Sequence, residues 1–439
     1  MTYTVLDVVI ILVFMVVAFV LSSKYLKSTE ISMAISGVVA IAFATIHGWT
    51  QEPVKLMVEG LFTNLDLAIL FVCASLFINI YSDTGAMAAL TRKLVKTFDS
   101  KWVLMTFMAV FMLIPGAITG AGSVSVFVVG GLVATVVRYM GLSDKKTAAF
   151  VFVFAILSAA APPINLWTML MTAQANMPYV GFELLLLIPI LIVGAFTIVL
   201  LGWGAQRQPK EVILEKMPTT SVKLDGFGGW LRILVPMVFL VVLILLSLYA
   251  PFVTPVLGLP LMFVLCAVVA LVCSPNPFSI KHLGKIVSDT MEQVFPLLAT
   301  VISVGVLQNG MAASGVKGII GTAFVLLPVI WIYITVLIVG PFAQGSMSYG
   351  SAVVIGTPLI FMFNTAGMNT IVVCAALSLI FPIGDCLPPS RIVGRITIEA
   401  VEYKGTYTSF LKQIALPCML LGGLALIMLI YPNVFAFLA

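Results

Sequence analysis

The chain has 439 residues, of which 62% are hydrophobic and only 9% charged, with a formal net charge of +5 and a mean hydropathy of +1.20. Soluble domains carry about 25% charged residues, so this composition excludes a soluble globular protein and indicates an all-α polytopic membrane protein. The net charge gives no reason to expect nucleic-acid binding, because most basic residues fall in loops between apolar segments.

The apolar segments predict both the spans and their orientation. Runs such as 5–21, 231–248 and 255–273 are long enough to cross about 30 Å of hydrocarbon as helices. No basic segment precedes the first run, so a transmembrane helix is expected there rather than a cleaved signal peptide. Alternating the spans leaves only Lys55 and Lys317 on the outer side. The positive-inside rule then places the N-terminus outside.

Catalytic and metal-binding patterns are lacking in the sequence. The six cysteines lie in apolar stretches without ligand spacing, and the only two histidines fall near span ends. A disulfide framework, a resident metal site and a histidine-based active site are therefore not expected. No phosphate-binding loop for ATP is present. The sequence predicts neither an enzyme nor a bound cofactor.

A segment of roughly fifty residues occurs twice in the chain. A shift of 226 residues superimposes Pro115 on Pro341 and the Pro162-Pro163 pair on Pro388-Pro389. The charge count makes the opening helices of the two copies run in opposite directions. This predicts inverted-topology repeats, the arrangement of many secondary transporters.

The duplication predicts how the chain is divided. The expected parts are N-terminal scaffold helices (1–60), a first repeat (61–203) with a hairpin (102–140) and a broken helix (147–175), a cytoplasmic linker (204–230), further scaffold helices (231–285), a second repeat (286–403) with a hairpin (319–365) and a broken helix (370–391), and a C-terminal helix (404–439).

Each copy has a Gly/Ser-rich segment followed by a helix that breaks at the double proline. Non-helical backbone persists inside a bilayer only where it is buried in protein or lines a cavity. Carbonyls freed by proline and nearby hydroxyls suit a hard cation such as Na+, and helix N-termini suit an anion. The two breaks are therefore expected to form a transport site. The expected substrate- and ion-binding residues are Thr119, Gly120, Gly122, Ser123, Ser125, Ser158, Pro162, Pro163 and Asn165 in the first copy, and Gly345, Ser346, Ser348, Ser351, Asp385, Pro388, Pro389, Ser390 and Arg391 in the second.

Some of these residues have alternative interpretations. Small residues in membrane helices also serve close helix packing. Asp385 is a carboxylate at membrane depth and a candidate for cation or proton coupling. The alternative is a pair with Arg391 that neutralises two buried charges. Arg391 could equally hold a substrate carboxylate or lie at the inner surface. Six further polar residues are expected mainly to cap or pack helices, namely Asn64, Asp66, Asn79, Asp83, Gln308 and Asn309.

At these motifs the sequence resembles the large membrane subunit of the tripartite ATP-independent periplasmic (TRAP) transporters, within the ion-transporter superfamily. The similar segments are GAGSVSVFVVGG and SAAAPPIN in the first copy, and TPLIFMFNTAGMN and GDCLPP in the second. The resemblance is best over about 60–200 and 290–400. It implies an elevator-type fold, with hairpin tips at 119–125 and 345–351 and breaks at 158–165 and 384–391.

The expected function is secondary active symport of small organic anions such as carboxylates, coupled to Na+ or H+. The alternative is a cation/proton antiporter or channel on the same fold. The resemblance implies a bacterial inner membrane, a small membrane subunit and a soluble substrate-binding protein as partners. A self-sufficient gluconate- or dicarboxylate-type symporter of the same superfamily is the close alternative, and a homodimer stays open.

Overall fold

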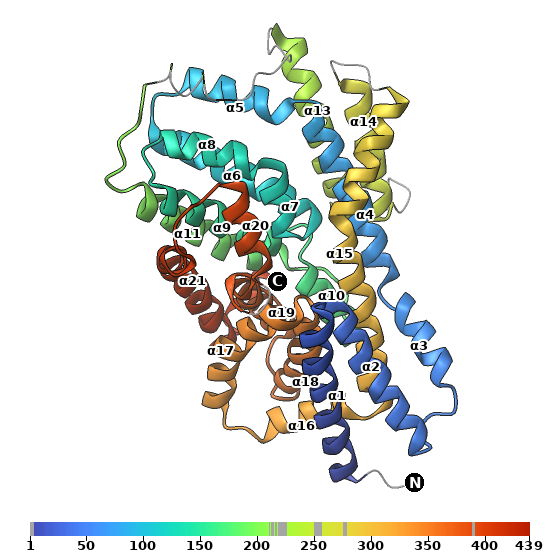
Figure 1. Cartoon of the computed structure of the whole chain (residues 1–439). Helices are drawn as coiled ribbons and strands as arrows, with labels where there is room; N and C mark the ends of the chain where they lie inside the picture. The colour runs from blue at the N-terminus through green and yellow to red at the C-terminus, as the bar shows by residue number, and fades with distance from the viewer. Residues whose placement is uncertain are drawn as a thin grey trace.

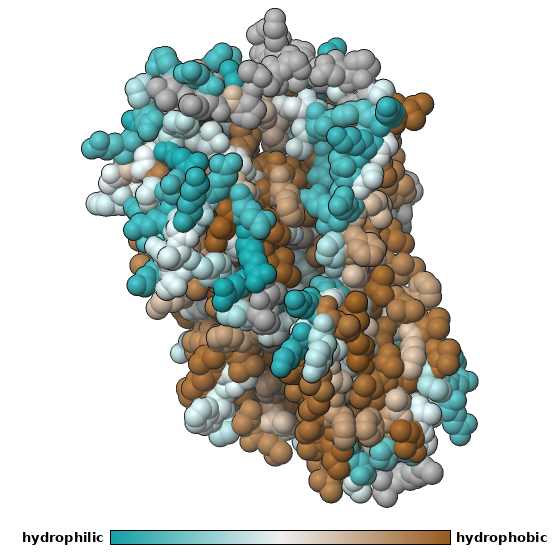
Figure 2. All heavy atoms as spheres, viewed as in Figure 1, coloured by the Kyte–Doolittle hydropathy of each residue, from teal (hydrophilic) through white to brown (hydrophobic). Residues whose placement is uncertain are grey.

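The computed structural model describes residues 4–209, 211, 215, 217, 226–249, 257–274, 279–388 and 391–439. The regular elements formed by these residues are all helical (Figure 1). Ten helices in this part of the chain are long and apolar enough to cross a membrane. Hydrophobic residues cover most of the lower half of the face shown in Figure 2, and hydrophilic residues gather in its upper half. The all-α membrane fold predicted from composition is confirmed.

The elements follow one another along the chain with short connections. They are α1 (Val5–Leu26), α2 (Thr29–Ile46), α3 (Pro53–Phe62), α4 (Leu65–Asp83), α5 (Ala86–Thr97), α6 (Lys101–Thr119), α7 (Gly122–Ser125), η1 (Val126–Gly130), α8 (Gly131–Tyr139), α9 (Asp144–Ala160), α10 (Leu166–Ala175), α11 (Glu183–Gly202), α13 (Gly226–Tyr249), α14 (Leu259–Cys273), α15 (Ile280–Ala313), α16 (Val316–Leu326), α17 (Val329–Met347), η2 (Ala352–Gly356), α18 (Thr357–Thr365), α19 (Thr370–Ile380), η3 (Phe381–Cys386), α20 (Ile392–Ala400), α21 (Tyr407–Ile430) and η4 (Phe435–Leu438).

The helices form two groups that lie side by side (Figure 1). In the first, α15 packs against α2, α3 and α4, while α1 packs on α2 and α14 on α4 and α13. In the second, α9 packs against α6, α11 and α21, while α19 packs on α21 and α17 on η3. We call the first group the scaffold and the second the hairpin bundle. The hairpin bundle contains both Gly/Ser segments, the Pro162-Pro163 pair and Pro388.

Helix bounds in the hairpin bundle repeat at the offset seen in the sequence. The π-helix η1 begins at Val126 and η2 begins at Ala352, a shift of 226 residues. The same shift relates α8 to α18 at both ends, and the first residue of α9 to the first residue of α19. Gly141 and Gly367, also equivalent, both adopt positive φ, at 93° and 71°. The duplication is therefore structural as well as sequential.

The scaffold shows that the repeats are inverted. Helix α4 and the later part of α15 are equivalent under the shift, and they run antiparallel: Asn79 Nδ2 donates to Thr290 Oγ1 over 3.0 Å, whereas Asn64 Nδ2 donates to Val301 O over 3.3 Å. The contacts are also related by symmetry. Asn64 is equivalent to Thr290 and Asn79 to Gly305, and a Cβ added at Gly305 would lie 3.4 Å from Asn64 Nδ2. The polar residues of α4 thus hold two counterpart helices together, as the packing interpretation expected.

Small residues bring α2 and α15 into backbone contact. A Cβ added at Gly37 would lie 2.6 Å from Val306 O, and one at Gly310 would lie 2.4 Å from Gly37 O. Both glycines therefore serve close helix packing, which is the usual role of small residues between membrane helices.

Some expected bounds differ in the structure. The second hairpin was predicted from residue 319, but 316–326 form the separate helix α16, and the hairpin begins with α17 at Val329. The reason is Pro328, which cannot donate a helical hydrogen bond and forms the N-cap of α17. Residues 210, 212–214, 216 and 218–225 of the expected linker, together with Pro389 and Ser390, lie outside the described residues.

Candidate functional site

A cavity of about 240 Å³ lies between the scaffold and the hairpin bundle. Its lining combines three carboxylates, several uncharged polar groups and an apolar wall. The polar lining residues are Glu30, Ser123, Glu292, Gln293, Thr300, Gln344, Ser348, Tyr349 and Asp385. None of the described lining residues is a lysine or an arginine. The wall therefore favours a positively charged ligand over a negatively charged one.

Asp385 is the carboxylate that the hairpin bundle contributes to this cavity. It lies in η3, which turns the end of α19 toward the scaffold, and only 8% of it is exposed. Gln344 Nε2 donates to its Oδ1 over 2.8 Å. The structure forms no ion pair between Asp385 and Arg391; the Arg391 guanidinium lies 4.7 Å from the centre of the Tyr407 ring instead. The second carboxylate oxygen is left for a proton or a cation.

At the first helix break, side chains bond two of the backbone carbonyls. Asn165 Nδ2 donates to Ala160 O and to Ser378 Oγ, both over 3.0 Å, and Asn165 Oδ1 caps α10 by accepting from Thr168 N. Tyr179 donates its hydroxyl hydrogen to Pro163 O over 3.0 Å. Two carbonyls at the Pro162-Pro163 break are thus already bonded within the protein.

The other expected residues of the first copy lie mostly in the same region. Ser125 and Ser158 share a hydrogen bond of 2.9 Å, and Thr119 donates to Pro115 O. Gly120 turns the chain with φ 70°, and its carbonyl accepts from the Tyr349 hydroxyl over 3.2 Å. Gly122 contacts α9, since a Cβ there would lie 2.6 Å from Ala155 O. Among the nine first-copy residues expected to bind substrate or ion, all of which the structure describes, only Ser123 lines the cavity.

In the second copy, the expected residues divide between the cavity and its supports. Ser348, which lines the cavity, adopts φ 50° and ψ −134°. Ser351 Oγ lies beside it, 2.9 Å from Ser348 O and 2.8 Å from Gln344 Oε1, and its single hydrogen serves one of these two acceptors at a time. Ser346 bonds Phe342 O within its own helix, and Gly345 approaches the second break, where a Cβ would lie 3.0 Å from both Leu387 O and Pro388 O. Pro388 itself is exposed.

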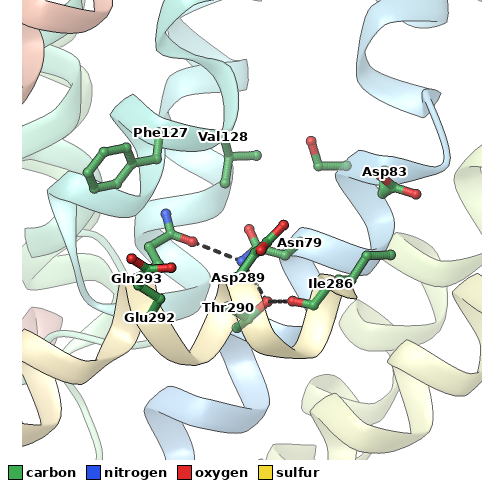
Figure 3. A pocket seen from close by; sticks show the side chains of 10 residues that line it. Asn79, Asp83, Phe127, Val128, Ile286, Asp289, Thr290, Glu292 and Gln293 are labelled. Atoms are coloured by element: carbon green, nitrogen blue, oxygen red, sulfur yellow. Dashed lines mark hydrogen bonds between the residues drawn. The ribbon is translucent and has the colours of Figure 1, made fainter. Parts of the chain in front are cut away.

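A wider, open cavity of about 830 Å³ adjoins the first one and is drawn in Figure 3. We call it the vestibule. The two cavities share Phe127, Glu292 and Gln293 in their linings. The vestibule also exposes Asp83 and Asp289. Because acidic walls of low dielectric attract counter-ions, this path raises the local concentration of cations.

Several residues of the site were not among those expected from the sequence. Glu292, Gln293 and Phe127 gave no motif, although carboxylates within a long apolar helix are themselves a signal of function. Gln344 and Tyr349 both lie inside the Gly/Ser-rich segment of the second copy, residues 341–351. Their role depends on which helices meet, and a single sequence does not show that.

Comparison with known proteins places this fold among transporters. Residues 1–205 match the model of a family described as the Na+/H+ antiporter family. No curated protein matches the sequence. The crystal structure of the YdaH transporter of Alcanivorax borkumensis is similar with a TM-score of 0.62, over 89% of this chain and 91% of that chain, at 12% identity. Neisseria gonorrhoeae MtrF, described as illuminating a class of antimetabolite efflux pumps, gives 0.58 over 85% and 84%, also at 12% identity.

At such identity these two likenesses show the fold alone. The chain therefore has a fold found in membrane transporters and is an integral membrane protein. The antiporter family match and these two structures do not show a TRAP subunit specifically, so that resemblance stays a prediction.

Proposed function

We propose that the protein is a cation/proton antiporter that exchanges Na+ for H+, with Asp385 binding the two ions in turn. The observation that carries this proposal is the position of Asp385. It is a buried carboxylate that forms no ion pair with the described basic residues, and it lines the cavity between the two groups of helices. A proton and a sodium ion compete for such a group, and this competition is the basis of exchange. The antiporter family match over residues 1–205 supports the same class.

In this proposal the vestibule is the cytoplasmic entrance. Helix α5, which carries Arg92, Lys93 and Lys96, follows directly after Asp83 in the vestibule wall, and basic residues mark the cytoplasmic side. Cations would enter past Asp289 and Glu292. Movement of the hairpin bundle along the scaffold would then carry Asp385 and its ion to the other side, as in other transporters built from inverted repeats.

The second candidate is the organic-anion symport expected from the sequence. The observation that favours it is the size of the cavity: 240 Å³ corresponds to about eight water molecules at roughly 30 Å³ each, more than one dehydrated Na+ needs. Hydroxyls of Ser123 and Ser348 line the cavity and could donate to a carboxylate. The three carboxylates in the lining act against an anion, so we place this candidate second.

The test uses purified full-length protein reconstituted in liposomes that enclose a pH-sensitive dye. Addition of Na+ outside vesicles with an acidic interior should raise the internal pH within seconds, and choline chloride at the same ionic strength should not. Uptake of radiolabelled mono- and dicarboxylates would be measured on the same vesicles. Proton movement that requires Na+ and no organic anion supports exchange. Carboxylate uptake that requires Na+, without Na+-driven proton release, would replace the proposal with symport.

A further inference from the structure

The side-chain amide of Gln344 is held by three hydrogen bonds. Its Oε1 accepts from Trp167 Nε1 over 2.7 Å and from Ser351 Oγ over 2.8 Å, and its Nε2 donates to Asp385 Oδ1 over 2.8 Å. An indole N–H can only donate. The group facing Trp167 must therefore be the amide oxygen, which leaves the amide nitrogen facing Asp385.

This orientation has a chemical consequence for Asp385. A donor aimed at a carboxyl group favours its charged form, whereas an acceptor at the same place favours its protonated form. Rotating the Gln344 amide by half a turn would place its oxygen, an acceptor, where its NH2 donor now faces Asp385, without moving the backbone. Trp167 opposes that rotation, because its N–H would then face the NH2 group and have no acceptor there. Ser351 fits either orientation, since its hydroxyl can donate to the amide oxygen or accept from the amide nitrogen while donating to Ser348 O.

Trp167 is well placed to hold the amide. Its side chain is fully buried, and its ring centre lies 4.8 Å from that of Tyr349. It stands in the first turn of α10, directly after the first helix break, where Asn165 caps the helix through Thr168 N. The first helix break carries no charged residue of its own. It directs the Trp167 indole toward Gln344, and through it toward Asp385 at the second break.

We infer that Trp167 is a positioning residue of the first repeat that holds Gln344 in the orientation favouring the charged form of Asp385, and so determines the pH range in which the cation binds. The inference rests on the proposed function, since it names the control of the same carboxylate. Trp167 and Asp385 belong to different repeats, so one copy of the duplicated element tunes the ion-binding group of the other.

The first measurement follows transport in the reconstituted full-length chain. In Trp167→Phe the ring volume is largely kept but the N–H is lost. We expect the pH of half-maximal Na+/H+ exchange to rise by about one unit, since charge-assisted hydrogen bonds shift protonation by that order. At neutral pH the KM for Na+ should rise about tenfold, while the maximal rate at alkaline pH is kept.

A second measurement does not depend on transport. Infrared difference spectra recorded during a pH titration would follow the carboxyl band that disappears in Asp385→Asn, and its midpoint should also rise by about one unit in Trp167→Phe. If the wild-type chain exchanges no Na+ for H+, the proposed function fails, yet this midpoint still tests Trp167. An unchanged midpoint in Trp167→Phe would overturn the inference.

Tyr179→Phe is the matched control. Tyr179 donates to Pro163 O and accepts from Asn165 N at the same helix break, without contacting Gln344. Its loss loosens the break in general and should leave both the pH profile and the infrared midpoint in place. An equal shift in this variant would mean that the helix break as a whole, and not the Trp167 N–H, sets the midpoint.

Discussion

Replacing Asp385 with asparagine is expected to abolish Na+/H+ exchange in proteoliposomes. The substitution removes the charge and the titratable proton but keeps the shape, and the new amide oxygen can still accept the hydrogen bond from Gln344 Nε2. Losing one member of a buried charge interaction costs about 3 kcal/mol or more, which corresponds to a roughly hundredfold loss of cation affinity. Sodium-driven proton release and the thermal shift induced by Na+ would be measured on the same preparation.

Asp66→Asn provides the control for this variant. Asp66 lies exposed in the first turn of α4 and is not among the described residues that line the two cavities. Exchange should stay near the wild-type rate. If Asp385→Asn retains Na+-coupled proton movement, Asp385 is not the ion carrier. If that variant still binds an organic anion with altered coupling, the symport candidate gains support.

Replacing Gly384 with alanine is expected to disrupt the site through packing alone. A Cβ at this position would lie 2.0 Å from Pro341 O and 2.7 Å from the Cβ of Gln344. The backbone oxygen belongs to α17 and cannot rotate away, so η3 and α17 must separate, which pulls Asp385 from Gln344. Overpacking of this kind costs about 1–3 kcal/mol. We expect a lower unfolding temperature in detergent and at least a tenfold loss of exchange.

Gly423→Ala separates this effect from a general intolerance of larger residues. Gly423 lies on α21, and a Cβ there would meet no atom within 4 Å. Both the unfolding temperature and the exchange rate should match the wild type. Wild-type behaviour in Gly384→Ala would show that η3 can move away from α17 without loss of stability or exchange. The hydrogen bond between Gln344 and Asp385 would then not be required for exchange.

The repeat could be predicted from sequence because prolines and glycines fix backbone positions wherever they recur. The shift that superimposes Pro115 on Pro341 also relates η1 to η2 and α8 to α18. Inversion was predicted from the loop charges, and the antiparallel contacts between α4 and α15 confirm it. The bounds at Pro328 were missed, because a proline within an apolar run is compatible with either a kink or a break.

The candidate site was only partly predictable. Asp385 gave a strong signal because carboxylates are costly inside a membrane. Trp167 gave none, since an apolar aromatic in a membrane helix is usual, and its partner Gln344 lies 177 residues away. Ser125 and Ser158 looked like free hydroxyls in the sequence, and their mutual hydrogen bond depends on how α7 meets α9.

The two repeats carry different side chains at one pair of equivalent positions, Phe127 and Val353. Phe127 in η1 is 55% exposed and lines both the vestibule and the cavity that contains Asp385. Its equivalent in η2, Val353, is only 2% exposed. In transporters with inverted repeats, the opposite-facing state arises when the two copies exchange conformations. That exchange would bury a phenylalanine and expose a valine, which changes the free energy even though the backbone is symmetric. In the proposed exchange cycle the two end states would therefore differ in free energy, and the residues at which the copies differ would set that difference.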